Sequence, residues 1–228
     1  MELEEFEALS RREKCEYIEL NYSSLGHAIG KTKKIMYDNC CNDVSFNVMV
    51  RIGKGKVQRQ HPAYNSWKGM IRRYYDPKDL NKNPSYNGCY VCDEWKYFSN
   101  YLPWWKENYI EDFQSDKDIL CFGNKVYSPK TCIFIPQWLN KFVVASDRNR
   151  GKSKLEVSWD KQCGKYKARC KMGRQKKVKT LGLFDNDTDA YSAWLNYKLE
   201  LLEDMKEEID KIDIRLYEAV KFKIKNLV

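Results

Sequence analysis

The clearest alternation of apolar and polar residues lies in the last third of the chain. In KLEVSW and in KYKARCK every second residue is apolar, which is typical of a strand with one buried face. Turn residues separate these segments from each other and from VKTLGLF, a third predicted strand. Asp187 or Thr188 then caps a helix with apolar residues at every third or fourth position from Ala190 to Ile209. The pattern predicts a three-stranded antiparallel sheet packed on an amphipathic helix.

The middle of the chain is rich in aromatic residues at helical spacing. One apolar stripe runs from Trp67 to Tyr75 and another from Trp95 to Trp105, and both predict helices. We expect these aromatic residues to form a core; a platform on which unpaired bases stack is the alternative. Two short strands, Asp116–Cys121 and Thr131–Ile135, are joined by a loop, and Pro136 opens a short helix. The order is strand, loop, strand, helix.

Both ends of the chain predict further elements. Residues 1–20 have the composition of an acidic helix, and SFNVMVRIGKGKVQRQ alternates like a pair of strands around two glycines. The closing stretch IRLYEAVKFKIKN predicts one more helix. With 228 residues, 43% of them hydrophobic, the chain is long and apolar enough to fold without disulfide bonds.

The positive charge is concentrated in one segment. The chain has 41 Lys and Arg against 32 Asp and Glu, a net charge of +9. Residues 148–179 hold thirteen of these cations and only two acids, a local net charge of +11, so the rest of the chain sums to −2. Such a block is typical of a surface that binds a polyanion. A solvated lysine-rich face that serves solubility is the alternative.

The sequence gives no sign of export or of a membrane partner. No apolar run approaches the roughly 18 residues that span a bilayer, and the acidic start MELEEFEAL is unlike a signal peptide. We therefore expect a cytoplasmic protein whose nine cysteines are reduced. Cys89 and Cys92 have the spacing of half a zinc site, which Cys121 and Cys132 could complete. Separately packed thiols are favoured over zinc.

Two longer segments resemble known families. YNSWKGMIRRYY, PSYNGCYVCDEWKYF and SDKDILCFGNKVYSPKTCIFIPQWLN follow one another between residues 61 and 142, and resemble the phage-borne HNH endonuclease family. YKARCKMGRQKKVKTLGLFDNDTDAYSAWLNYK resembles the APETALA-type DNA-binding domain that many such endonucleases carry. The two resemblances occur in the order usual for the family, and they imply a phage protein made in the cytoplasm of a bacterial host.

The resemblances imply an α+β fold: an HNH-like ββα-metal core with flanking helices, then a three-stranded antiparallel sheet packed on a helix. Residues 1–60 would form an acidic helical segment and a small β connector. Residues 61–146 would form the HNH-like domain. Residues 147–228 would form the APETALA-type domain with C-terminal helices.

The HNH resemblance also implies a site for one divalent cation, Mg²⁺ or Mn²⁺. Matched by position, Asp116 and Asn140 fall on the metal ligands, Lys117 on the general base and Thr131 on the residue that orients that base. Carboxylate and amide oxygens suit a hard cation. Lysine is a poor replacement for the family's histidine, because an ammonium accepts no proton near pH 7.

Two further residues are alternatives for this chemistry. His61 could supply the missing base, although a lone histidine is more often structural. Asp118 could add a second carboxylate, but an acid in a salt bridge is the more common role.

The basic sheet predicts the DNA contacts. Cationic side chains on its outward face would meet phosphates and guanine edges in the major groove. Arg169 and Arg174 are favoured for guanine, because guanidinium can bond it in two places. The residues expected to contact DNA are Lys165, Lys167, Arg169, Lys171, Arg174, Lys177 and Lys179.

Two functions remain open from the sequence, with a third less favoured. One is a metal-dependent endonuclease that cuts or nicks double-stranded DNA. The other is a catalytically inactive HNH scaffold that binds DNA without cutting it, or that inhibits a host defence system through a host protein partner. Binding of RNA or single strands through exposed aromatic residues is the third.

Overall fold

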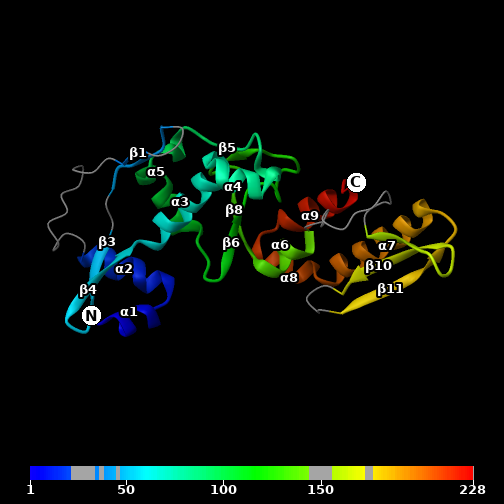
Figure 1. Ribbon diagram of the computed structural model, residues 1–228, viewed down its shortest axis with the longest axis horizontal. Coiled ribbons are helices and arrows are strands. Elements are labelled where there is room, and N and C mark those ends of the chain that lie inside the picture. The colour runs from blue at the N-terminus through cyan, green and yellow to red at the C-terminus, as the bar shows by residue number, and fades with distance from the viewer. Residues whose placement is uncertain (22–33, 36–38, 45–46, 144–155, 173–176, 228) are drawn as a thin grey trace. The chain divides into compact units, whose positions relative to one another are not determined.

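The computed structural model describes residues 1–21, 34–35, 39–44, 47–143, 156–172 and 177–227 (Figure 1). The chain has an α+β architecture of helices and small sheets, and it divides into two compact units. Unit 1 comprises Met1–Phe113 and Asn124–Phe134, and unit 2 comprises Gln114–Gly123 and Ile135–Val228. The boundaries expected at residues 60 and 146 stay predictions. None of the helices in the described parts of the chain is long and apolar enough to cross a membrane.

Unit 1 consists of helices and short strand pairs. β3 pairs with β4 and β1 with β2 in antiparallel fashion, and β5 pairs with β7 in parallel. Its elements are α1 (Leu3–Ala8), α2 (Arg11–Asn21), β1 (Lys34–Ile35), β2 (Cys41–Asn42), β3 (Asn47–Ile52), β4 (Gly55–Gln60), α3 (Pro62–Tyr75), α4 (Pro77–Lys82), β5 (Tyr90–Val91), α5 (Phe98–Asn108), β7 (Val126–Tyr127) and two 3-10 turns, Pro84–Tyr86 and Glu94–Lys96.

The single acidic helix expected over residues 1–20 is two helices. Leu9 is extended, and Ser10 starts α2 with a reciprocal cap: Glu13 N donates to Ser10 Oγ at 3.2 Å, and Ser10 N donates to Glu13 Oε2 at 2.8 Å. This pairing satisfies backbone donors that a helix start leaves without partners. Serine followed three positions later by glutamate is a signal that the sequence already carried.

The expected helix near Trp95 also divides. Trp95 lies in the 3-10 turn Glu94–Lys96, Tyr97 is extended, and α5 begins at Phe98. The carboxylate of Asp43 accepts a hydrogen bond from Ser99 N at 2.9 Å and a second from the Ser99 hydroxyl. A residue distant in sequence therefore caps the helix and fixes where it begins.

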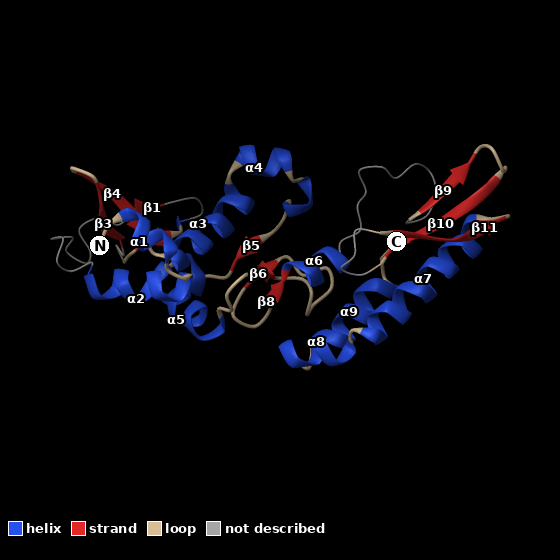
Figure 2. Ribbon diagram, turned by 90° about the horizontal axis from the view of Figure 1, so that it is seen from below, coloured by secondary structure: helices blue, strands red, loops and turns tan. Residues whose placement is uncertain are grey.

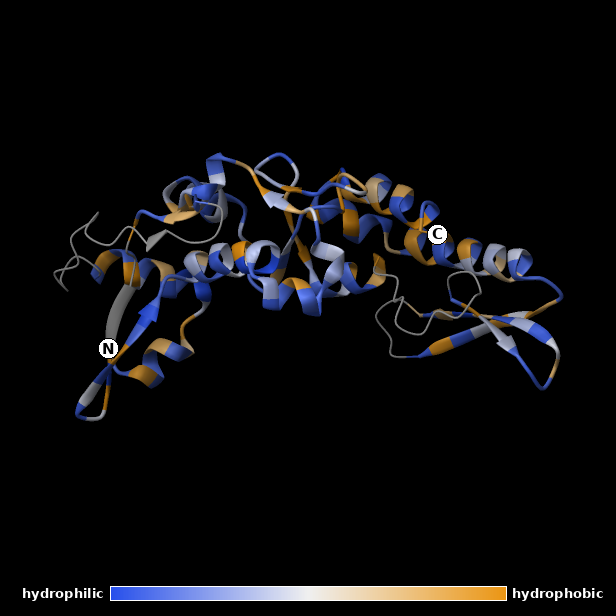
Figure 3. Cartoon of the chain, turned by 45° about the horizontal axis from the view of Figure 1, so that its top comes forward, coloured by the Kyte–Doolittle hydropathy of each residue, from blue (hydrophilic) through white to orange (hydrophobic). Residues whose placement is uncertain are grey.

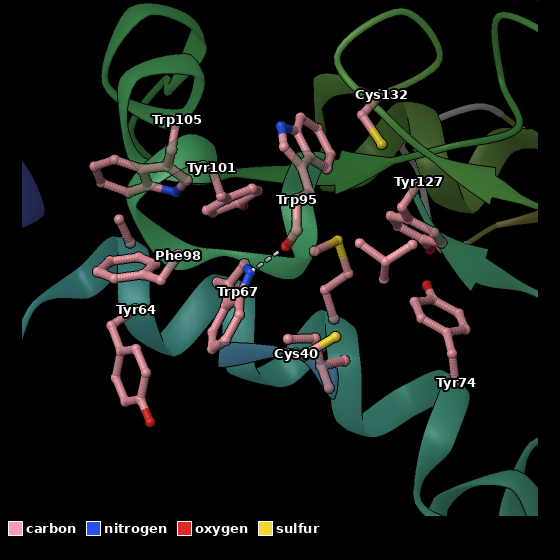
Figure 4. Packing of buried hydrophobic residues seen from close by; sticks show 14 of the residues in the cluster. Cys40, Tyr64, Trp67, Tyr74, Trp95, Phe98, Tyr101, Trp105, Tyr127 and Cys132 are labelled. Atoms are coloured by element: carbon pink, nitrogen blue, oxygen red, sulfur yellow. Dashed lines mark hydrogen bonds between the residues drawn. The ribbon is translucent and has the colours of Figure 1, made fainter. Parts of the chain in front are cut away.

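The aromatic stripes form the core of unit 1, as expected (Figure 4). Trp67 is fully buried, and its indole N–H donates to the carbonyl of Trp95 at 2.7 Å. Trp105 stacks on Tyr109 with ring centroids 4.2 Å apart. Cys89 and Cys132 are buried in the same cluster. The aromatic side chains of this cluster thus pack against one another.

β6 (Phe113–Asp116) and β8 (Ile133–Pro136) form a two-stranded sheet, and α6 (Gln137–Val143) follows β8. The strand expected over Asp116–Cys121 is wrong in position, because β6 ends at Asp116. Asp116 Oδ1 accepts hydrogen bonds from the backbone N–H groups of Asp118 at 2.9 Å and Ile119 at 2.7 Å. Such a local side-chain turn competes with the strand ladder and ends it.

The C-terminal part of unit 2 has the predicted layers (Figure 2). β9 (Val157–Asp160), β10 (Lys165–Lys171) and β11 (Val178–Phe184) form an antiparallel sheet in the order β11–β10–β9. One face packs on α7 (Asp187–Asp204), which α8 (Lys206–Ile212) and α9 (Leu216–Lys225) follow. In Figure 3 hydrophobic residues recur between hydrophilic ones along the helices, the pattern of elements with one buried side.

Two details of the C-terminal helices differ from expectation. The side chain of Asn186 accepts a hydrogen bond from Asp189 N at 2.8 Å, so Asn186 caps α7 rather than Asp187 or Thr188. The apolar repeat expected to continue to Ile209 is interrupted at Met205, between α7 and α8. Spacing alone did not reveal this break.

We predict that Trp67→Phe lowers the free energy of unfolding by about 2–3 kcal/mol, because it leaves the buried Trp95 carbonyl without its donor and removes ring volume. Urea unfolding measures the loss. Trp159→Phe is the matched control, since Trp159 is 49% exposed, and a change within about 0.5 kcal/mol is expected there. Equal losses in both variants would contradict this account of the core.

Candidate functional site

The sheet of unit 2 has one apolar and one cationic face. Ala168 and Cys170 are buried on the face that packs on α7, together with Val157. Since side chains alternate along a strand, the intervening residues of β10 lie on the opposite face. We call this the outer face; its residues are Ser158, Asp160, Lys165, Lys167, Arg169, Lys171, Val178, Thr180 and Leu183.

Acidic residues neutralise one end of the outer face. Lys167 forms an ion pair with Asp160, and Lys165 Nζ lies 3.1 Å from Asp185 Oδ1. The hydrogen bond from Lys167 lowers the pKa of Asp160. Arg169 and Lys171 are exposed and have no acidic partner among the described residues. The uncompensated charge of β10 is therefore at its C-terminal half.

Lys179 departs from the expected outward position. A β-bulge between Ala168 and Arg169 shifts the register of β11, so that Arg169 pairs with Thr180 and Cys170 pairs with Lys179. A shift of one residue exchanges the two faces of a strand. Lys179 thus lies on the helix side, with its ammonium 4.3 Å from the ring centroid of Tyr197.

The remaining predicted DNA contacts lie in the β10–β11 connection. Lys177 is exposed, and its carbonyl accepts a hydrogen bond from Met172 N at 3.0 Å. The expectation for Arg174 falls outside the described residues.

A second polar cluster of unit 2 contains three of the residues discussed for the HNH site. Asp118 holds two ammonium groups: Lys117 Nζ lies 3.1 Å from its Oδ2, and Lys223 Nζ, from α9, lies 2.7 Å from its Oδ1. Asp116 is two residues away and caps the turn described above. No local pattern in the sequence indicates a role for Lys223. It lies 105 residues from Asp118, and its position in the sequence is typical of a lysine on the exposed side of a helix.

The two carboxyl groups have opposite pKa shifts. Burial, and then the negative charge of Asp118, raise the pKa of Asp116. Burial also raises the pKa of Asp118, but the hydrogen bonds and charges of Lys223 and Lys117 outweigh it and lower the pKa overall. Asp118 is thus the carboxylate that the lysines hold ionised.

The residues matched to the HNH roles in unit 2 have contacts of their own. Lys117 is 6% exposed, and its Nζ lies 3.1 Å from Asp118 Oδ2, so its side chain is already engaged in a contact within its own turn. Asn140, on α6, donates from Nδ2 to Gln114 Oε1 at 3.3 Å. Ammonium groups already neutralise Asp118, and one oxygen of Asp116 is used by backbone donors. A cation bound at these carboxylates would compete with these contacts.

His61 and Thr131 belong to unit 1 and have structural contacts there. Buried His61 caps α3: its Nδ1 accepts from Ala63 N at 3.1 Å, and its Nε2 lies 3.0 Å from Glu19 Oε1. Burial lowers the pKa of His61, and Glu19 opposes this. The Thr131 hydroxyl donates to the carbonyl of Val126 at 2.8 Å. Both side chains thereby stabilise local backbone.

Cysteines and acids of the described residues form no group of three or more that could hold a metal ion. Cys89 is buried in the aromatic core and Cys92 is half-buried. Burial raises the pKa of Cys92, which disfavours the thiolate that zinc would require.

No model of a known family, no curated protein and no solved structure matches this chain.

We predict that Asp118→Asn lowers the free energy of unfolding at pH 7 by about 2–4 kcal/mol, because two poorly exposed lysines lose their counter-charge. The Asp118 pKa is lower in the folded state than the unfolded value of about 3.9. The ion pairs therefore stabilise the fold fully well above pH 4 and lose this contribution as the pH falls through the folded-state pKa.

Urea unfolding of both proteins at neutral and acidic pH measures this difference, which should shrink in acid. Asp93→Asn is the control, because Asp93 pairs with Lys96 at 2.9 Å but its side chain is 95% exposed. A surface pair of this kind contributes about 0–1 kcal/mol. A difference that is constant with pH would exclude the ion pairs as its cause.

Proposed function

We propose that this protein binds double-stranded DNA through the outer face of the β9–β11 sheet. The observation that carries the proposal is the pair Arg169 and Lys171, which are exposed on the central strand without an acidic partner among the described residues. Cations on one face of a small sheet can meet phosphates while the sheet enters the major groove, which is about 12 Å wide.

The distribution of charge favours this function over a merely solvated surface. The opposite face of β10 is buried on α7, so the cations of this strand are confined to one side. Asp160 and Asp185 neutralise Lys167 and Lys165, which leaves the positive charge focused near Arg169 and the exposed Lys177. Solubility alone requires no such segregation.

We predict that Arg169→Gln with Lys171→Gln weakens binding to a mixed-sequence DNA duplex by about tenfold or more at about 0.1 M salt. The slope of log affinity against log salt should fall by about two, because two phosphate contacts are lost. Fluorescence anisotropy across a salt series measures both quantities.

The control for this experiment removes two charges elsewhere in unit 2. In Lys179→Gln with Lys221→Gln, both substituted ammonium groups lie over tyrosine rings, at 4.3 Å from Tyr197 and 5.3 Å from Tyr217. Affinity within about twofold of the unsubstituted protein is expected, since neither lysine lies on the outer face. If both double variants weaken binding equally, net charge rather than the outer face is responsible.

An endonuclease is the second candidate. It is supported by the order β6, β8, α6, with Asp116 at the end of the first strand and Asn140 on the helix, which is the arrangement that the HNH resemblance implies. The pairing of Lys117 and Lys223 with Asp118 argues against it, because the candidate second carboxylate already has two lysine partners and the residue at the base position is one of them. We therefore favour binding without hydrolysis, as in a repressor or an inhibitor of a host system.

We predict that the protein leaves supercoiled plasmid intact in the presence of Mg²⁺ or Mn²⁺. Asp116→Asn with Asn140→Ala should bind DNA as the unsubstituted protein does, because neither residue lies on the outer face; the introduced amide would retain an oxygen for the turn at Ile119. Agarose electrophoresis and the anisotropy assay measure the two outcomes. Nicking that disappears in this double variant would establish the endonuclease instead.

A further inference from the structure

Unit 1 contains a polar cavity that the proposed DNA binding does not use. The cavity has a volume of about 430 Å³ and lies between α1, α2, β4 and the N-terminal part of α3. Its size is within the range of about 300–1,000 Å³ that is typical of small-molecule sites. Its lining includes three cationic residues, Arg11, Lys14 and Arg59, and one acid, Glu7.

The carboxylate of Glu7 already occupies an anion position between two of these cations. Arg59 Nε donates to Glu7 Oε1 at 2.6 Å, and Lys14 Nζ lies 3.7 Å from Glu7 Oε2. The side chain of Glu7 is 50% exposed, whereas those of Arg59 and Lys14 are 30% and 19% exposed. The acid is therefore the member of the cluster that can turn outward at least cost.

The two cations have other contacts that hold them in place. Lys14 Nζ donates to the Glu7 carbonyl at 2.9 Å and lies 5.8 Å from the ring centroid of Phe6. Arg59 donates from its guanidinium to the Gln58 carbonyl at 3.2 Å. An anion that displaced the Glu7 carboxylate would meet a preformed pair of donors, one of them a guanidinium suited to phosphate.

The rest of the lining is neutral. Gln60, Asn65 and Ser66 offer amide and hydroxyl groups, and Phe6 and Pro62 are apolar. A bare phosphate ion would leave these residues unused, whereas a larger molecule could bond to the amides and lie against the apolar side. We propose that this cavity binds a phosphorylated small molecule of about nucleotide size, with its phosphate in place of the Glu7 carboxylate between Lys14 and Arg59.

Isothermal titration of the full chain tests the proposal, with adenosine 5′-monophosphate, adenosine and inorganic phosphate as probes. The monophosphate should bind more tightly than either of the others. Arg59→Met and Lys14→Met should each weaken its binding by about tenfold or more, the loss typical of a charge-assisted hydrogen bond. Glu7→Gln should tighten binding several-fold, because the competing anion is removed. The same variant should be less stable without the ligand, because the ion pairs of the empty site are lost.

The opposite effects of Glu7→Gln on binding and on stability distinguish a site from a structural cluster. Circular dichroism establishes that each variant is folded, and Lys78→Met, an exposed substitution on α4, is the charge control. Absence of monophosphate binding to the folded protein and to Glu7→Gln would overturn the proposal, as would binding that Arg59→Met leaves unchanged. Inorganic phosphate that binds as tightly as the monophosphate would overturn the ligand class.

Discussion

The burial of Ala168 and Cys170 against α7 determines what the C-terminal sheet can offer to a partner. Once these side chains are fixed in the core, the period of the strand directs Arg169 and Lys171 to the other side. The hydrophobic effect thus arranges the charges, although it acts on none of them directly. DNA binding as proposed depends on this arrangement, because dispersed cations would raise net charge without making a surface.

The cluster around Asp118 uses the same kinds of residues for another purpose. Here the ammonium groups of Lys117 and Lys223 are poorly exposed and directed at a carboxylate of their own chain, so they connect α9 to the turn after β6. Buried ion pairs of this kind contribute little net stability but tolerate the loss of a partner poorly. Lys117 thus has a structural role in this pairing.

Elements defined by strong periodicity could be predicted from sequence, whereas their ends and partners could not. The alternation in KYKARCK and the stripe from Trp67 to Tyr75 correspond to β10 and α3, because burial acts on every repeat. The start of α5 depends on Asp43, and the ion pairs of Asp118 depend on Lys223, contacts between distant residues that no local pattern encodes. Resemblance located Asp116 and Asn140 in sequence but carried no information on which hydrogen bonds their side chains make.

The bulge in β11 has a consequence for how this surface can evolve. Because the extra residue of β11, Leu181, sets the parity of the strand, Leu181 packs with the core and Lys179 lies over Tyr197. Point substitutions alter one position at a time and leave that parity intact. Deletion of one residue within this stretch would instead exchange the inward and outward residues along the remainder of β11. Related chains could therefore gain or lose a whole row of contacts through a single in-frame deletion or insertion.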